Sequence, residues 1–250
     1  SIYYHSYKAL SNHEEEGNFR KLKELVALHE SKFPKEEQIS FYRILINYCI
    51  RRLNLGDSNF YGEIFEIYKK GLEVEVFIEH GIFHPSTFGN IVMTGLRLKE
   101  HDWTEEFLFK YKETLPAEQK EGIFNYNLAR FHYQKKDYNK AMPLLSRMDT
   151  DDVLTNCSAK TLLAKMYFEQ EEYEALESLL NSFKIYIRRK KVLGYHKELY
   201  EHFILYSRQL WSLVIQNQKE SRGLFQKIQE TKIVAEKRWL LEQTEKRFRI

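Results

Sequence analysis

The sequence is poor in residues that bend or end regular structure. It has only ten glycines and four prolines among 250 residues. Sheet-rich proteins need more of these residues for their turns, and disordered chains are less hydrophobic, so both classes are disfavoured. Aromatic residues make up 15% of the chain and charged residues 30%. This mixture is typical of amphipathic helices with bulky apolar faces and solvated outer faces.

Cysteine is also scarce, and its placement excludes the usual cysteine chemistry. Cys49 and Cys157 are far apart and form neither a metal-binding pair nor a redox motif. Both lie in apolar stretches with helical spacing, where a free thiol acts as a small buried hydrophobic group.

Long hydrophobic runs are absent. No run approaches the roughly 18 residues needed to cross a bilayer, and no signal-peptide pattern is visible. We therefore expect no membrane insertion and a cytoplasmic location. Because the chain opens at Ser1 without an initiator methionine, we also expect it to be the C-terminal part of a longer polypeptide.

Motifs that carry chemistry are missing as well. There is no HExxH zinc motif, no Cys/His cluster, no glycine-rich phosphate loop and no GxSxG elbow. His80 and His84 have i, i+4 spacing, but Gly81 and Pro85 disfavour a shared helix face. The sequence thus predicts no catalytic residue, no metal and no cofactor, and an all-helical hydrolase with an unmarked active site is the least favoured alternative.

A 35-residue period is the most informative feature that is present. An acid followed by an aromatic residue recurs at 102–103, 137–138 and 172–173, with Trp103, Tyr138 and Tyr173 as the aromatics. Such a period indicates stacked helix-turn-helix units that cannot bury their apolar faces alone. First helices are expected to begin near 85, 116 and 152 and to end near 100, 135 and 170. Second helices are expected to begin at the three aromatics, with a kink or late start near Pro143.

Helical patterns also flank these units. We expect helices at about 2–12, 18–30, 34–55 and 60–71, the last with a possible extension toward residue 79, and at 195–216, 220–229 and 232–247. A single helical-repeat domain would then comprise irregular helical hairpins at 1–84, three clear repeats at 85–190 and basic capping helices at 191–250.

The middle unit resembles a tetratricopeptide repeat. That family places Leu and a small residue within the first helix, an aromatic after the turn and Ala three residues later; these places are held by Leu128, Ala129, Tyr138 and Ala141. The next unit matches again through Leu163, Ala164, Tyr173 and Leu176, and the preceding one is degenerate, with Met93, Thr94, Trp103 and Glu106. The resemblance implies an all-α, right-handed superhelical array of antiparallel helix pairs with atypical C-terminal capping helices.

In that family the first helices line a concave face where ligands bind. Carried over by position, the resemblance points to Lys99, Tyr126, Arg130, Tyr133, Lys165 and Phe168 as partner-binding residues. Arg130 and Lys165 are one repeat apart, and two cations flanked by aromatics suit a carboxylate or an acidic extended peptide. The alternative is that both cations are merely solvated and that Tyr133 and Phe168 pack between helices.

Charge is unevenly distributed. From residue 184 onward there are 16 Lys and Arg against 7 Glu, a net of +9, whereas the whole chain carries +3. The densest cluster is Lys184, Arg188, Arg189, Lys190 and Lys191, flanked by Tyr186 and Tyr195. This mixture suits nucleic acid or an acidic protein surface, but cations at a helix C-terminus also complement the helix dipole.

Together these patterns favour a non-catalytic protein–protein interaction scaffold that binds a peptide or protein segment in a concave helical groove. The alternative from another class is binding of nucleic acid, or of another acidic partner, through the basic C-terminal third.

Overall fold

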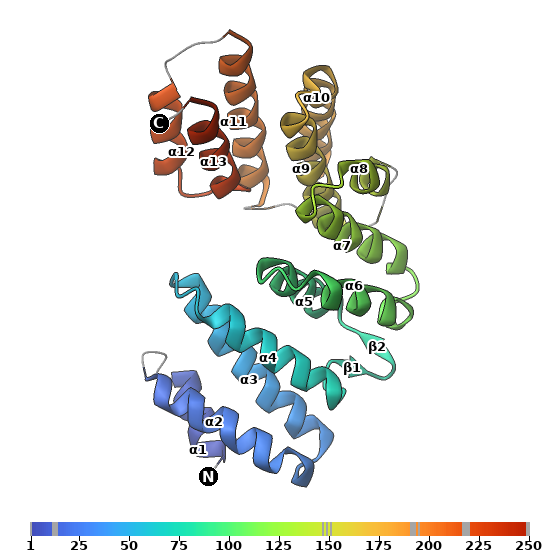
Figure 1. Ribbon diagram of the computed structural model, residues 1–250, viewed down its shortest axis with the longest axis vertical. Coiled ribbons are helices and arrows are strands. Elements are labelled where there is room, and N and C mark those ends of the chain that lie inside the picture. Colours follow the sequence, from blue (N-terminus) through green and yellow to red (C-terminus); the bar gives the residue numbers. More distant parts are fainter. Residues whose placement is uncertain are drawn as a thin grey trace. The chain divides into compact units, whose positions relative to one another are not determined.

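In its described residues, the protein's regular structure is helical apart from one short hairpin. Figure 1 shows its computed structural model, which describes residues 2–11, 15–146, 148, 150, 152–190, 194, 196–216 and 221–248. By packing, the chain separates into two compact units, residues 1–127 and 128–250, here named the N-terminal and C-terminal units. This division does not test the sequence sections 1–84, 85–190 and 191–250, which stay predictions.

The N-terminal unit contains six complete helices and the start of a seventh. They are α1 (Ile2–Ser11), α2 (Glu16–His29), α3 (Lys35–Asn54), α4 (Phe60–Glu73), α5 (Pro85–Arg97), α6 (His101–Lys110) and α7 (Lys120–Gln134), with 3-10 turns at Glu30–Lys32 and Lys112–Thr114. Helices adjacent in sequence pack against each other, α3 on α4 and α5 on α6. Helix α7 runs across the division between the two units.

The C-terminal unit completes the chain with helices α8 (Tyr138–Ser146), α9 (Val153–Glu169), α10 (Tyr173–Arg189), α11 (His196–Gln216), α12 (Ser221–Glu230) and α13 (Lys237–Phe248). Among the described residues, no helix is long and apolar enough to cross a membrane.

The predicted helix boundaries of the 35-residue units are largely confirmed. Helix α5 begins at Pro85, α8 at Tyr138 and α10 at Tyr173, and Asp152 caps α9 by accepting from the backbone of Thr155 at 2.9 Å. Helix α7 starts later than predicted, at Lys120, because residues 116–119 form a turn first. Pro143 lies inside α8 without delaying its start.

The first helices of the three 35-residue units, α5, α7 and α9, all end with the same backbone conformation. Lys99, Lys136 and Glu171 all have positive φ, near 60°. In each case the next residue donates its N–H to the carbonyl five positions earlier, as Glu100 does to Gly95, Asp137 to His132 and Glu172 to Tyr167, each at 2.9 Å. This is the Schellman arrangement, which satisfies carbonyls left over at a helix end and turns the chain sharply.

Aromatic rings at each turn join neighbouring helices. Trp103 meets the ring of Phe65 on α4 at 4.7 Å, and Tyr173 stacks on Trp211 of α11 at 5.8 Å. Tyr138 stacks on Tyr133 and donates its hydroxyl to Glu169 of α9. All three rings are half-buried between helices rather than directed into solvent.

One segment departs from the helical expectation. Helix α4 does not extend toward residue 79: it ends at Glu73 because Glu75 adopts positive φ and Val76 donates to the carbonyl of Gly71. An antiparallel hairpin follows, formed by β1 (Ile78–Glu79) and β2 (Ile82–Phe83). Its two-residue turn, His80-Gly81, has positive φ at both positions, as such tight hairpins favour.

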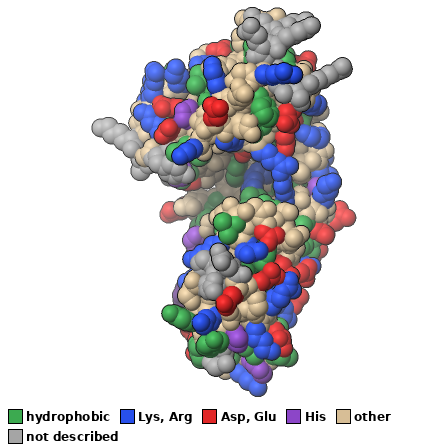
Figure 2. Space-filling model, turned by 90° about the vertical axis from the view of Figure 1, so that its left-hand side faces the viewer, with side chains coloured by type: hydrophobic (Ala, Val, Ile, Leu, Met, Phe, Trp, Pro, Cys, Tyr) green, Lys and Arg blue, Asp and Glu red, His purple; other side chains and the backbone are tan. Residues whose placement is uncertain are grey.

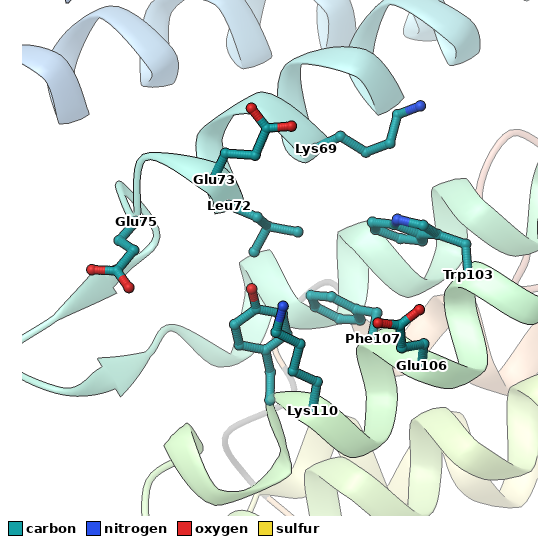
Figure 3. Close-up of a pocket in the computed structure, with 9 residues that line it drawn as sticks. Lys69, Leu72, Glu73, Glu75, Trp103, Glu106, Phe107 and Lys110 are labelled. Carbon is teal, nitrogen blue, oxygen red and sulfur yellow. The ribbon is translucent and has the colours of Figure 1, made fainter. Parts of the chain in front are cut away.

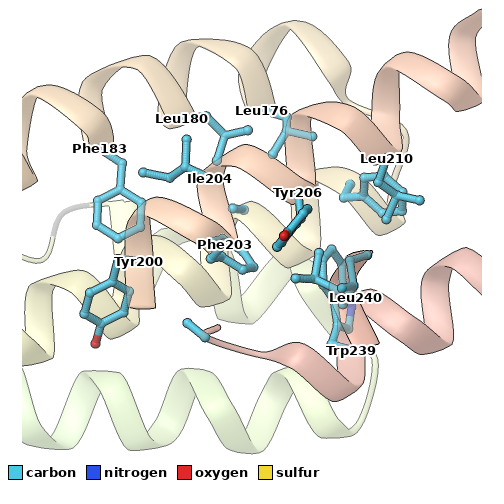
Figure 4. Close-up of a cluster of buried hydrophobic side chains, with 14 of the residues drawn as sticks. Leu176, Leu180, Phe183, Tyr200, Phe203, Ile204, Tyr206, Leu210, Trp239 and Leu240 are labelled. Carbon is cyan, nitrogen blue, oxygen red and sulfur yellow. The ribbon is translucent and has the colours of Figure 1, made fainter. Parts of the chain in front are cut away.

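The C-terminal helices belong to the core of their unit. Figure 4 shows Leu180 and Phe183 of α10 packed with Phe203 and Leu210 of α11 and with α13. On α13, Leu240 and Thr244 are both 0% exposed. Helix α13 begins at Lys237 rather than near 232, since the preceding backbone is held by a bond from the Ala235 N–H to the Leu199 carbonyl.

Small residues set the closest helix contacts. The predicted small positions Thr94, Ala129 and Ala164 are all buried. Beside Thr94, Gly95 of α5 lies so near α6 that an added Cβ would stand 2.3 Å from the Thr104 Oγ1 atom. Thr104 is itself fully buried and donates to the Glu100 carbonyl, so it cannot easily move away.

The Gly95→Ala variant is therefore expected to lower the free energy of unfolding by about 1–3 kcal/mol, the usual cost of overpacking. Gly62→Ala is the matched control, because Gly62 lies in α4 and an added Cβ there would meet no atom within 4 Å. It should raise stability by about 0.5–1 kcal/mol through helix propensity. Urea unfolding measures both, and equal effects of the two variants would contradict the close packing of α5 on α6.

Candidate binding surfaces

Three of the predicted groove residues come together in the C-terminal unit, against the chain's own C-terminal segment. Lys165 donates from Nζ to Glu236 Oε2 at 2.6 Å, and its ammonium lies 4.8 Å from the ring centre of Tyr133. Phe168 is fully buried and meets the ring of Trp239 edge-on at 5.4 Å. The side chains of Glu236 and Trp239 thus occupy the positions where a ligand was expected.

A buried carboxylate lies beside these residues. Glu169 Oε1 accepts from the Tyr133 hydroxyl at 2.5 Å and from Trp239 Nε1 at 2.7 Å. Its Oε2 atom accepts from Lys136 Nζ at 2.9 Å and from the Tyr138 hydroxyl. Glu169 and its four donors lie on α7, α8, α9, α13 and the α7–α8 turn. The hydrogen bonds of this one carboxylate therefore connect four helices.

The electrostatics keep this carboxylate ionised. Burial alone would raise the pKa of Glu169, but the donors Tyr133, Tyr138, Lys136 and Trp239 together lower it below its usual value. Burial and the nearby Glu169 charge raise the pKa of Tyr133, so that phenol stays protonated. A carboxylate whose oxygens are already engaged by four donors has little capacity left for a substrate, and its arrangement fits a structural role.

Replacing Glu169 by Gln should lower the free energy of unfolding by about 2–3 kcal/mol at pH 7, since an amide NH₂ would face donors in place of an acceptor. The pKa of Glu169 is lower in the folded chain than in the unfolded chain. Its contribution is therefore present above the unfolded pKa, about 4.3, and is lost as the pH falls through the folded value.

Urea unfolding of the wild-type protein and Glu169→Gln between pH 3 and 7.5 tests this expectation, and the stability difference should shrink below about pH 4. Glu174→Gln is the control, because Glu174 is exposed in the first turn of α10. An unchanged difference at pH 3, or an equal loss in the control, would contradict the assigned role of the carboxylate.

The other predicted groove residues lie elsewhere. Lys99 is exposed in the N-terminal unit, at the left-handed position after α5. Tyr126 and Arg130 are one turn apart on α7 and half-buried, and both have partners within the protein. The part of each residue in binding a partner stays a prediction.

The predicted basic cluster lies on an exposed helix end. Lys184, Arg188, Arg189 and Lys190 are all exposed at the C-terminal end of α10, and Lys191 falls outside the described residues. Lys190 Nζ and Lys160 Nζ of α9 lie 5.4 Å and 5.5 Å from the ring centre of Tyr186. The structure thus adds Lys160 to a cluster that the sequence showed only along one stretch.

The sequence patterns did not reveal the clefts. In the N-terminal unit, a cleft of about 200 Å³ lies between α3, α5 and the β1–β2 hairpin, and we call it the amide cleft. Its α3 wall carries Ile39, Arg43, Ile46, Asn47 and Ile50, and its other lining residues include Glu79, His84, Thr87 and Asn90. The three isoleucines follow helical spacing, but no sequence signal marks the polar residues between them as a surface.

A larger cleft of about 430 Å³ lies between α4 and α6 in the same unit (Figure 3). Leu72, Trp103 and Phe107 form its apolar part, and charges of both signs surround them. Lys69 is already paired with Glu66, and Glu73 with Lys70. Because positive and negative side chains both surround this cleft, it favours neither an anionic nor a cationic ligand.

One face of the protein is mixed in charge. On the face drawn in Figure 2, Lys and Arg side chains are interspersed with Asp and Glu. Among the described residues, no group of three or more His, Cys, Asp or Glu is placed to hold a metal ion. Comparison of the chain with protein-family models, with curated proteins and with solved structures found no significant match.

Proposed function

We propose that this protein is a non-catalytic interaction scaffold of tetratricopeptide-like type that binds an extended peptide or protein segment. Three features support the repeat architecture: the shared Schellman ends of α5, α7 and α9, the buried small residues in those helices, and the aromatic rings that join neighbouring helices. Helices stacked in this way leave their first-helix face free to line a groove.

The amide cleft is the observation that carries the proposal. Asn47 of α3 and Asn90 of α5 both line it, and neither side-chain amide has a partner among the described residues. An amide side chain offers an acceptor and two donors, so it can bind both the N–H and the C=O of a peptide backbone. The isoleucines of α3 provide apolar contact for alternate side chains of an extended segment.

The neighbouring hairpin favours an extended ligand. Strand β1 pairs only with β2 within the two-stranded sheet, and Glu79 of β1 lines the cleft. A strand with an unpaired edge can accept another extended segment through backbone hydrogen bonds. The amide cleft therefore offers backbone recognition from two helices and one strand.

The C-terminal unit is less suited to hold such a ligand on its first helices. There, Lys165 is bonded to Glu236, and Phe168 is buried under Trp239. A ligand at these positions would have to displace α13 side chains from the core of the unit. In the amide cleft the internal contact is an exposed ion pair between Arg43 and Glu79 at 3.9 Å, which a ligand could displace at little cost.

The nucleic-acid alternative has no specific observation in its favour. Tyr186 is the aromatic within the basic cluster, and the ammonium groups of Lys160 and Lys190 lie over its ring. A base that stacked on this ring would have to displace them.

Selection of short peptides from a random display library on the full chain tests the proposal. Enriched peptides should lose affinity by about 10- to 100-fold for the double variant Asn47→Ala/Asn90→Ala, because each amide contributes about 1–1.5 kcal/mol of hydrogen bonding. Fluorescence anisotropy measures the affinity. Asn139→Ala is the control, since Asn139 is exposed on α8 in the other unit. Failure to enrich any peptide, or equal binding by the double variant, would refute the amide cleft as the site.

A further inference from the structure

A third cleft lies in the C-terminal unit, where the helices α8 and α10, which both pack on α9, differ in length. Helix α8 has 9 residues and α10 has 17, which correspond to about 13 Å and 25 Å of helix. Beyond the end of α8 at Ser146, parts of α9 and α10 border a cleft of about 360 Å³, which we call the α8–α10 cleft. Its lining is apolar at Leu145, Met148, Ala159, Leu163, Ala175 and Leu179 and polar at Asn156, Lys160, Tyr167, Ser178 and Ser182.

Lys160 connects this cleft to the basic end of α10. It lines the cleft, and its ammonium lies over the Tyr186 ring together with that of Lys190. The Tyr186 hydroxyl accepts from Asn156 Nδ2 at 3.2 Å, and Asn156 also donates to the Thr150 carbonyl at 2.5 Å. Asn156 is buried, so its hydrogen bond holds the Tyr186 ring, over which both ammonium groups lie, in a defined position.

Five cations lie beside the cleft or near the C-terminal end of α10. Within the described residues, none of the five side chains of Lys160, Lys184, Arg188, Arg189 and Lys190 lies within 4 Å of a carboxylate oxygen. Some cations elsewhere in the unit are paired, as Arg208 is with Glu177 and Lys197 with Glu201. Others, such as Lys135, Lys227 and Lys232, have no ion pair among the described residues. We name these five residues the cationic rim.

The helix dipole explains only part of the cationic rim. Arg188, Arg189 and Lys190 are in or next to the last turn of α10, where a positive charge is favoured. Lys184 lies before that turn, and Lys160 lies on α9, so the dipole does not account for either. By helical spacing, Arg189 and Lys190 lie on the side of α10 that carries Ser178 and Ser182, whereas Lys184 and Arg188 lie on the other side. An anion bound at the cleft would therefore compensate Lys160, Arg189 and Lys190.

We propose that the α8–α10 cleft and the cationic rim together bind an acidic segment of a protein partner. An apolar side chain of the segment enters the cleft, and its carboxylates lie against Lys160, Arg189 and Lys190. Arginine binds a carboxylate through two parallel hydrogen bonds, whereas lysine acts as a point charge. This surface is distinct from the amide cleft in position and in chemistry, so it goes beyond the function proposed above.

The geometry favours a peptide over a nucleic acid. The rim extends over about 9 Å of α10, from Lys184 to Lys190, which is short compared with surfaces that neutralise six to ten phosphates. The covered Tyr186 ring offers no free platform for a base. An apolar cleft beside the rim adds a feature that a phosphate backbone would not use.

The test uses three pools of fluorescent twelve-residue peptides and the full chain. The first pool carries several Asp or Glu residues and one Phe, Leu or Trp; the second has Ser in place of the apolar residue; the third has Lys in place of the acids. The first pool should bind at least about tenfold more tightly than either of the others. Equal binding of the first two pools, or no binding of the first, would overturn the proposal.

Two variants locate the binding. Lys160→Glu/Arg189→Glu reverses the rim charge beside the cleft, and Ser178→Phe fills the cleft from an exposed position without changing any charge. Each should weaken binding of the first pool by about 10- to 100-fold. Lys32→Glu/Lys246→Glu changes the net charge equally at exposed positions outside the rim and should bind like the wild-type protein. Circular dichroism checks that all variants keep their helices.

Further arms distinguish the outcomes. Tighter binding to a twenty-nucleotide oligothymidine, or to vesicles of phosphatidylcholine with 30% phosphatidylserine, than to the first pool would replace the proposal by a nucleic-acid or a membrane partner. The Asn47→Ala/Asn90→Ala variant should still bind the first pool at wild-type strength. Loss of binding in that variant would place these peptides in the amide cleft and overturn the second site, whatever the outcome for the amide cleft itself.

Discussion

A two-helix hairpin always leaves one apolar face uncovered, and every other feature of this structure follows from how that face is buried. The small residues Thr94, Ala129 and Ala164 allow helices to approach closely, and the aromatic rings at 103, 138 and 173 fill the space at each turn. The left-handed residues at the helix ends redirect the chain so that the next helix can pack back. Clefts remain where this covering is incomplete.

The last helices show how the series of hairpins ends. In the C-terminal unit, α11 and α13 cover α9 and α10 with Phe203, Leu210 and Leu240 (Figure 4). They also bring Glu236 against Lys165 and Trp239 against Phe168, two residues that the sequence predicted to bind a partner. The contacts that cover an apolar face of the unit thus also engage these predicted binding residues.

Two sets of charged groups in the C-terminal unit differ sharply in their surroundings. Glu169 is buried and receives four donors, as a charge removed from water must if folding is to remain favourable. The cationic rim around Tyr186 is exposed and, within the described residues, has no carboxylate within reach. Charges of the first set hold helices together, whereas those of the second set can exchange water for an acidic partner.

The sequence by itself determined the all-α class, the 35-residue period and most helix starts, because spacing, caps and turn residues act over a few positions. The sequence indicated that Tyr133 and Phe168 either line a binding groove or pack between helices, but it did not distinguish these alternatives. Only the tertiary structure decided that Lys165 meets Glu236, 71 positions later, and that Lys160 joins the end of α10. The hairpin after α4 and the clefts likewise depend on helix lengths and on contacts between distant segments, which local sequence patterns do not encode.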